Sequence, residues 1–267
     1  PIKNLYARIG KKGPNLCYAG HTDVVPPGNI KDWTINPFKP SVKKNYLIGR
    51  GANDMKSSIA CFVAAVSKFL NKNKKFNGSI SFLITGDEEG YAINGTKKVL
   101  EELAKKSVKI DSCIVGEPTC PSQLGDMIKI GRRGSLTAFF TAKGIQGHSA
   151  YPERAKNPLP ALVSLMDIFC QHDLDGGNEH FDQSTLSVTT IDTGNTANNI
   201  IPSQTRATVN IRFNDAHSGE SLKNWLQKEA RNVSNKTGID ISVKFKISGE
   251  SFITPPGDLS ALIVKAI

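Results

Sequence analysis

The sequence predicts an α/β fold into which an α+β unit is inserted. Up to Glu117, short apolar runs that end in polar turns alternate with amphipathic helical patterns, which is typical of a mostly parallel sheet covered by helices. After Gly131 the pattern changes to strand, helix, strand, strand, helix, strand, the order of a ferredoxin-like sandwich. The length of 267 residues fits one large domain or two ordinary ones.

Composition narrows the class of protein. Hydrophobic residues make up 39% and charged residues 22% of the chain, and no apolar run approaches the ~20 residues that a membrane helix needs. The net charge of +10 comes from scattered lysines rather than from one basic stripe with interleaved aromatics, so we expect no nucleic-acid partner and no membrane partner. The charge also favours acidic small substrates. Five cysteines without a CxxC pair indicate a reducing, cytoplasmic setting.

The first strand is expected at residues 16–20, where an apolar run leads into "GHTDVVPPG". His21 and Asp23 lie two residues apart, so in an extended chain their side chains point to the same face. A histidine with a neighbouring carboxylate is a typical metal ligand with its orienting acceptor. Alone, the pair does not define a site. Residues 32–46 follow as a polar, Pro-punctuated loop.

A Gly-rich turn then delivers Asp54 to the start of an amphipathic helix, expected at residues 57–71. Asp54 has two interpretations at this point. It is either a first-turn acid favoured by the helix macrodipole or a member of a site built from other segments.

The strand expected at residues 80–84 is apolar throughout, which indicates burial on both faces. Three acids follow it, namely Asp87, Glu88 and Glu89. Ligands of open α/β sheets bind outside the carboxyl ends of the strands, so these acids are candidates for a catalytic or metal site. The alternative is an ordinary acidic turn.

The next strand repeats this arrangement. After a helix expected at residues 95–104, the apolar run at residues 110–115 ends in Glu117. Four strand or loop ends thus present carboxylates around one imidazole: His21, Asp23, Asp54, Glu88, Glu89 and Glu117. Such a donor set suits zinc or a similar divalent metal. A single metal ion needs fewer carboxylates than these segments supply. Two metal ions that share one bridging carboxylate, with one further acid as general base, would use all of the acids.

The second half of the chain contains the expected α+β unit. Its strands are expected at residues 135–142, 185–191, 206–213 and 239–246, and its helices at 158–171 and 221–235. His172, His180 and His217 lie in polar segments without a partner motif, so we expect them to be solvated.

Seven motifs occur in order along the chain: "GHTDVVPPG", "GRGANDMKSS", "ITGDEEGYAINGT", "VGEPT", "GRRGS", "GIQGHSAYP" and "NNIIPS". Together they resemble the zinc aminoacylase/carboxypeptidase (M20) family over essentially the whole chain. The resemblance implies a zinc-peptidase-like catalytic domain at residues 1–133 and 249–267. It also implies an inserted ferredoxin-like dimerisation or lid domain at residues 134–248, and hence a homodimer.

The resemblance implies a role for each matched residue of the acidic site. His21 and Glu117 correspond to ligands of one zinc, Asp54 to the carboxylate that bridges two zinc ions, and Glu89 to a ligand of the second. Glu88 corresponds to the general base. Asp23 corresponds to the carboxylate that orients His21.

Further roles fall on the second half of the chain. His148 corresponds to a histidine that stabilises the reaction's oxyanion from the partner subunit. Positions expected to bind substrate carboxylates and amides are matched by Arg132, Ser135, Tyr151, Asn198, Asn199 and Arg212.

The implied reaction is hydrolysis of N-succinyl-LL-2,6-diaminopimelate to succinate and LL-2,6-diaminopimelate, in bacterial lysine and cell-wall precursor synthesis. Two Zn²⁺ per subunit, replaceable by Co²⁺, are the implied cofactors. Two alternatives stay open: another N-deacylase or peptidase of the family, such as acetylornithine deacetylase, and a non-catalytic binding or dimerisation protein.

One feature departs from the family pattern. The second zinc of the family also takes a histidine from near the C-terminus, and none follows Pro256 in this sequence. The family's first helix is missing at the start as well. We therefore expect a part of a longer protein, with an incomplete second metal position on the Glu89 side.

Overall fold

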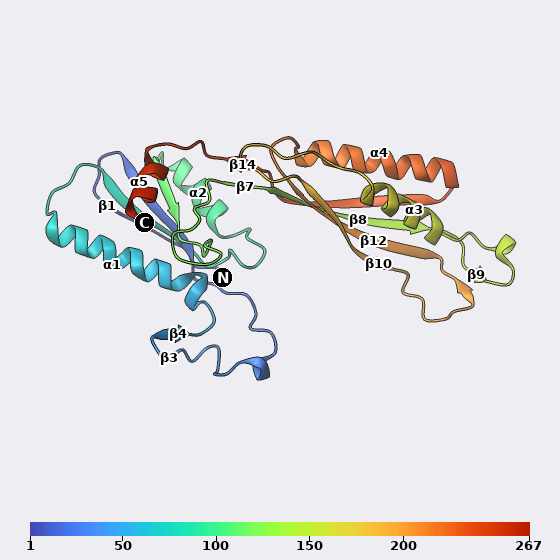
Figure 1. Cartoon of the computed structure of the whole chain (residues 1–267), viewed down its shortest axis with the longest axis horizontal. Helices are drawn as coiled ribbons and strands as arrows, with labels where there is room; N and C mark the ends of the chain where they lie inside the picture. Colours follow the sequence, from blue (N-terminus) through green and yellow to red (C-terminus); the bar gives the residue numbers. More distant parts are fainter. The chain divides into compact units, whose positions relative to one another are not determined.

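The computed structural model describes residues 1–267, which divide into two units (Figure 1). One unit comprises residues 1–128 together with Ile267, and the other comprises residues 129–266. None of the helices combines the length and the apolar character that crossing a bilayer requires.

The first unit is built on a four-stranded sheet in the order β1-β5-β2-β6. Its strands are β1 (Leu5–Ile9), β2 (Asn15–His21), β5 (Ser79–Thr85) and β6 (Ser112–Val115). Strand β2 runs parallel to both β5 and β6, as predicted, whereas β1 runs antiparallel to β5 and was not predicted. The parallel pairing brings the carboxyl ends of β2, β5 and β6 to one edge of the sheet.

The two faces of β5 differ in burial. Ser79, Ser81, Leu83 and Thr85 are buried, but the alternate residues 80, 82 and 84 are only half-buried. The prediction that this strand is buried on both faces is therefore wrong. The half-buried face is covered in part by a helix, whose Phe62 meets Phe82 edge to face at 5.4 Å between ring centroids.

Two helices of the first unit begin and end close to their predicted bounds. They are α1 (Ser57–Lys72) and α2 (Thr96–Lys105). Phe62 of α1 also stacks on Tyr18 of β2, with ring centroids 4.5 Å apart. Cys17, Leu83 and Leu103 form a small buried core on the other side.

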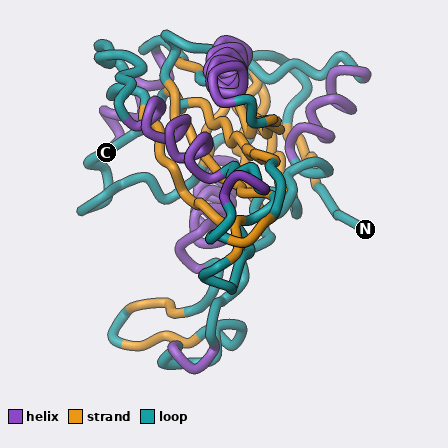
Figure 2. The backbone as a smooth tube through the Cα atoms, turned by 90° about the vertical axis from the view of Figure 1, so that its right-hand side faces the viewer, coloured by secondary structure: helices purple, strands orange, loops and turns teal.

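A hairpin lies inside the segment expected to be a polar loop. Strands β3 (Ser41–Lys43) and β4 (Tyr46–Ile48) pair antiparallel across Lys44 and Asn45, which both adopt positive φ angles. Two-residue turns of this kind match the twist of hairpin strands. Figures 1 and 2 show the hairpin and the neighbouring short helix η1 (Ile30–Asp32) set apart from the main sheet of their unit.

The second unit has the predicted βαββαβ order. Its main elements are β8 (Gly134–Lys143), α3 (Leu159–Cys170), β10 (Thr185–Asp192), β12 (Gln204–Phe213), α4 (Gly219–Thr237) and β13 (Asp240–Gly249). The strands form an antiparallel sheet in the order β10-β12-β8-β13. Both helices pack against one face through a continuous core that includes Phe140, Phe169, Ile211 and Leu226. The ferredoxin-like prediction is confirmed at the level of element order and sheet topology.

Shorter elements complete the chain. They are η2 (Ala52–Lys56), β7 (Gly131–Arg132), β9 (Gly147–His148), η3 (Pro152–Arg154), β11 (Ile200–Ile201), β14 (Phe252–Ile253) and α5 (Asp258–Ala266). Four of these short strands form two antiparallel pairs, β9 with β11 and β7 with β14.

Candidate metal centre

His21, the last residue of β2, lies at the centre of an acidic cluster and is 1% exposed. Its Nε2 atom lies 3.1 Å from Asp54 Oδ1 and 3.4 Å from Glu117 Oε1. Glu88 Oε2 is the next carboxylate oxygen, at 3.9 Å. Carboxylates from three other segments of the chain therefore converge on one imidazole nitrogen.

The parallel sheet explains why these segments meet. Glu88 and Glu89 follow β5, and Glu117 follows β6, at the edge where β2 ends in His21. Asp54 belongs to the irregular turn η2, where its backbone angles (φ −119°, ψ 100°) are not helical. It is therefore not a first-turn acid of a regular helix, and its carboxylate turns to His21 instead.

Asp23 contacts His21 and also the acidic turn. Nδ1 of His21 lies 3.0 Å from the backbone carbonyl oxygen of Asp23 and 3.6 Å from its Oδ1 atom. Oδ2 of Asp23 accepts hydrogen bonds from the backbone N–H groups of Glu88 and Glu89, both at 2.9 Å. Asp23 thus holds His21, the candidate metal ligand, and the turn that carries two of the acids.

The third acid of the turn has a structural contact of its own. Asp87 accepts hydrogen bonds from the backbone N–H groups of Ala92, at 3.3 Å, and Asn94, at 2.8 Å. These bonds close the loop between β5 and α2. Asp87 is therefore a loop-closing residue rather than a member of the cluster around His21.

The cluster carries excess negative charge. No lysine or arginine forms an ion pair with Asp54, Glu88, Glu89 or Glu117. Burial and the neighbouring Asp54 carboxylate raise the pKa of Glu117, and burial, Asp54 and Glu88 raise the pKa of Glu89. Burial lowers the pKa of His21, but the Asp23 carbonyl and the surrounding carboxylates outweigh it and raise that pKa overall. A bound cation would relieve this repulsion.

The donor atoms form two groups that could hold a metal ion, each with its ligand atoms within 4.8 Å of one another. One group is His21, Asp54 and Glu117, and the other is His21, Glu88 and Glu89. An imidazole with hard carboxylates fits zinc and similar divalent metals. The two groups overlap at His21, so they outline one continuous donor cluster.

One residue of the site was missed by sequence reasoning. Met55 is fully buried, and its Sδ atom accepts a hydrogen bond from the backbone N–H of His21 at 3.2 Å. A Cβ atom at Gly20 would approach the Met55 side chain to 2.8 Å, so the glycine permits this close packing. Only its place beside Asp54 in "NDMK" could have drawn attention to Met55.

The second unit brings another set of candidates together. His148 of β9 lies beside β11, and its Nε2 is 3.5 Å from Nδ2 of Asn199. Nδ1 of His148 accepts a hydrogen bond from the backbone N–H of Ala150 at 3.0 Å. The Tyr151 ring lies 5.9 Å away, centroid to centroid. Asn198 precedes Asn199 in the same turn.

The remaining candidates lie elsewhere in that unit. Ser135 and Arg212 are direct cross-strand partners on β8 and β12. Arg132 lies on β7, opposite Phe252 of β14. The structure thus pairs Ser135 with Arg212 and His148 with Asn199, and it places Arg132 in a separate two-stranded element.

The prediction that His217 is solvated is wrong. Its Nε2 lies 3.2 Å from Asp175 Oδ2 and 3.1 Å from the carbonyl oxygen of Leu174, and its side chain is 21% exposed. The partners lie more than 40 residues away in the chain, where no local pattern points to them. His172 stacks on Trp225 at 4.7 Å and is exposed, as is His180.

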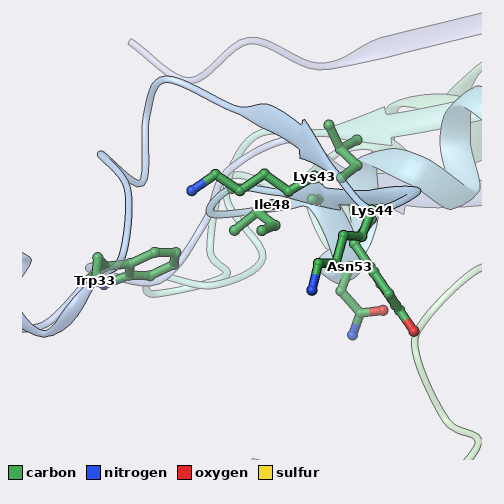
Figure 3. A pocket seen from close by; sticks show the side chains of 9 residues that line it. Trp33, Lys43, Lys44, Ile48 and Asn53 are labelled. Carbon is green, nitrogen blue, oxygen red and sulfur yellow. The ribbon is translucent and has the colours of Figure 1, made fainter.

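A hollow lies beside the β3–β4 hairpin, and Figure 3 shows the side chains that line it. Its volume is about 560 Å³, and its lining includes Trp33, Lys43, Lys44, Ile48 and Asn53. Arg50 lies over the Trp33 ring at 5.0 Å. None of the acidic residues lines it.

Comparisons with known proteins agree with this architecture. The family model described as Peptidase family M20/M25/M40 matches residues 17–267. Curated relatives over the full chain include the succinyl-diaminopimelate desuccinylases of Cereibacter sphaeroides (strain ATCC 17029), 56% identical, and of Pelagibacter ubique (strain HTCC1062), 55% identical. The chain spans 70% of the length of each.

Solved structures share the fold at low identity. The aminopeptidase PepT of Bacillus cereus matches with a TM-score of 0.75 at 17% identity, over 97% of this chain and 65% of that one. The M20 family metallo-carboxypeptidase Sso-CP2 of Sulfolobus solfataricus matches with a TM-score of 0.71 at 19% identity, over 90% of this chain and 66% of that one. With the family match over nearly the whole sequence, these findings lead to one conclusion: the chain belongs to peptidase family M20/M25/M40.

Proposed function

We propose that this protein hydrolyses N-succinyl-LL-2,6-diaminopimelate to succinate and LL-2,6-diaminopimelate, a step in diaminopimelate and lysine biosynthesis. The observation that carries the proposal is the identity of 55–56% over the entire chain to relatives named succinyl-diaminopimelate desuccinylase. The acidic cluster around His21 supports a hydrolase of the metal-dependent kind.

Two divalent metal ions, zinc in the first instance with cobalt as a substitute, are the proposed cofactors. His21, Asp54 and Glu117 would hold the first ion. Glu89 would hold the second, with Asp54 as the shared carboxylate. A structural neighbour at 17% identity, the YXEP protein of Bacillus subtilis, is described as a dinuclear metal-binding peptidase of this family.

The protein's own groups have distinct tasks in this proposal. Bound metal would lower the pKa of a water molecule toward ~7 and polarise the amide carbonyl. Glu88 is the general base: its carboxylate accepts the proton of the attacking water and later donates it to the leaving amine. Asp23 holds the backbone of Glu88 and Glu89 and orients His21. Glu88 suits the role of base because neither of its carboxylate oxygens pairs with a lysine or an arginine.

Residues of the second unit are proposed to bind substrate. His148 would stabilise the developing oxyanion from the partner subunit of a homodimer. Arginine matches carboxylates through its planar fork, so Arg132 and Arg212 would bind the substrate carboxylates. The polar groups proposed to assist them are those of Ser135, Tyr151, Asn198 and Asn199.

The domain organisation follows from the same proposal. Residues 1–133 and 249–267 would belong to the catalytic domain, and residues 134–248 to the dimerisation domain. The enzyme would act in the bacterial cytoplasm.

The test is a substrate comparison. Zinc-loaded protein is incubated with N-succinyl-LL-2,6-diaminopimelate and, separately, with N-acetylornithine, and the free amine released is quantified. A much higher kcat/KM for the succinylated substrate than for N-acetylornithine supports the proposal. Preference for the acetyl substrate would instead favour a deacetylase of the family. Zinc binding without hydrolysis of either substrate would favour a binding protein.

A further inference from the structure

Tyr18 lies beneath the acidic cluster and touches each segment that supplies a ligand of the first metal group. It belongs to β2, three residues before His21, and is 2% exposed. Its ring stacks on Phe62 of α1 at 4.5 Å, which leaves the hydroxyl as its polar end. A phenol is protonated at neutral pH, so this hydroxyl can act as a donor.

The hydroxyl connects β2 to the turn that carries Asp54. Tyr18 donates a hydrogen bond to Oγ of Ser58 at 2.8 Å, and Ser58 Oγ donates one to the carbonyl oxygen of Met55 at 2.7 Å. Met55 directly follows Asp54, and both residues have non-helical backbone angles. A backbone hydrogen bond from the N–H of Lys56 to the carbonyl oxygen of Gly51, at 3.0 Å, spans this irregular turn, and the Tyr18–Ser58–Met55 link adds side-chain contacts that hold it to β2.

The same hydroxyl packs against the segment that carries Glu117. A Cβ atom at Gly116 would overlap the Tyr18 hydroxyl and would lie 2.7 Å from Oγ of Ser58. Only a glycine permits this contact. Glu117 follows immediately, so the position of its backbone is set against the Tyr18–Ser58 pair.

We infer that the Tyr18 hydroxyl is a positioning group of the metal site, which holds Asp54 and Glu117 at their distances from His21. His21, Asp54 and Glu117 come from three separate segments, and Tyr18 joins all three through the contacts above. The inference rests on the proposed metal centre but not on the identity of the substrate.

The main variant is Tyr18→Phe, which removes the hydroxyl and keeps the ring stacked on Phe62. Zn²⁺ affinity is measured by competition with a chelator, and the visible absorption spectrum is recorded during titration with Co²⁺. Partners of metal ligands typically contribute 10–100-fold to metal affinity, so we expect about 10-fold weaker binding and an altered Co²⁺ spectrum. The matched control is Tyr6→Phe, which removes a hydroxyl that meets Asn15 Nδ2 at 3.4 Å in the same sheet, away from the ligands.

Two further variants separate positioning from general stability. Ser58→Ala breaks the same link and also removes the bond to the Met55 carbonyl, so the double variant with Tyr18→Phe should lose no more metal affinity than Ser58→Ala alone. Gly116→Ala should weaken metal binding because its new methyl group meets the Tyr18 hydroxyl, and adding Tyr18→Phe should restore part of the loss. Thermal unfolding of every variant checks the fold.

The outcomes are distinct. Wild-type Zn²⁺ affinity and an unchanged Co²⁺ spectrum in Tyr18→Phe would overturn the inference, and so would equal losses in Tyr18→Phe and Tyr6→Phe. Wild-type protein that binds neither ion would overturn the metal centre itself. Metal binding with no desuccinylation would refute only the proposed function.

Discussion

The carboxylate of Asp23 accepts a hydrogen bond at 2.9 Å from the backbone N–H of Glu88, which lies 65 residues further along the chain. The same oxygen accepts a second bond from the N–H of Glu89, and the other oxygen faces Nδ1 of His21 at 3.6 Å. One side chain therefore connects the proposed ligand histidine to the proposed base. This relationship gives Asp23 a larger role than orienting an imidazole.

Replacement of Asp23 should disturb metal binding and turnover together. We expect Asp23→Ala to weaken Zn²⁺ binding by about 10–100-fold, since both His21 and the acidic turn lose their partner. Asp23→Asn should lose less because its amide oxygen still accepts from the two N–H groups. Zn²⁺ competition and steady-state kinetics measure both effects. Asp32→Ala, at the exposed end of η1, is the control, and unchanged metal affinity in Asp23→Ala would contradict the linkage.

Glu88→Gln should abolish most hydrolysis and leave metal binding largely intact. The amide has the shape of the carboxylate but cannot accept the proton of the attacking water. General bases contribute roughly 10²–10⁴-fold, so kcat should fall by about that factor. Kinetics and metal analysis are compared with Glu101→Gln, an exposed residue of α2. A Glu88→Gln enzyme with wild-type kcat would refute the assignment.

Metal affinity should fall as the pH is lowered. The pKa values of His21, Glu89 and Glu117 are raised in the metal-free protein, so these proposed ligands hold protons at a higher pH than usual and must release them to bind metal. Calorimetric titration with Zn²⁺ at several pH values, in buffers of different ionisation enthalpy, measures the protons released. Binding without proton release across the range would contradict the raised pKa values.

The same carboxyls make the metal-free protein less stable at higher pH. Because folding raises the pKa of Glu89 and Glu117, their contribution to stability is fully present below the usual pKa of 4.5 and is lost as the pH rises through the raised values. We expect Zn²⁺ to raise the melting temperature more at pH 7 than at pH 5. Differential scanning calorimetry with and without the ion tests this, and an equal increase at both pH values would count against it.

Asp175 should stabilise the second unit except in acid. Burial alone would raise its pKa, but hydrogen bonds from Ser184, Gly177 and Asn214 outweigh burial and lower the pKa from 3.8 to about 2. Its contribution, about 2 kcal/mol, is therefore present above pH 3.8 and lost as the pH falls toward 2. Asp175→Ala should lower the free energy of unfolding by about that amount at pH 7.

Urea unfolding at pH 7 and pH 3 measures the effect of Asp175→Ala. The difference between wild type and variant should shrink at the lower pH. Asp173→Ala, an exposed neighbour, should change neither value. A difference that stays the same at both pH values would show that the carboxylate charge is not responsible.

Sequence reasoning located most of the acidic cluster because these residues lie at the ends of short apolar strands. His21 ends β2, Glu88 and Glu89 follow β5, and Glu117 follows β6. Parallel pairing then places these ends together, which is a general property of such sheets. Asp54 was already among the candidates from the sequence, but its place in an irregular turn was needed to decide between a first-turn helix acid and a member of the cluster.

Three other features of the structure could not be predicted because no local sequence pattern indicates them clearly. The β3–β4 hairpin depends on positive φ angles at Lys44 and Asn45, which the sequence "KN" indicates only weakly. The incomplete burial of β5 depends on what covers each face of the sheet. His217 was assigned to solvent because its partner Asp175 lies in a distant loop.

By itself, the sequence determined the kinds of elements, their order and the ligand types, because periodicity, turn residues and strand-end acids are local properties of the chain. Only the tertiary structure decided which atoms meet: Asp23 with the N–H groups of Glu88 and Glu89, Tyr18 with Ser58 beneath Gly116, and His217 with Asp175. These contacts join segments tens of residues apart, so they exist only after the sheet and its loops have packed.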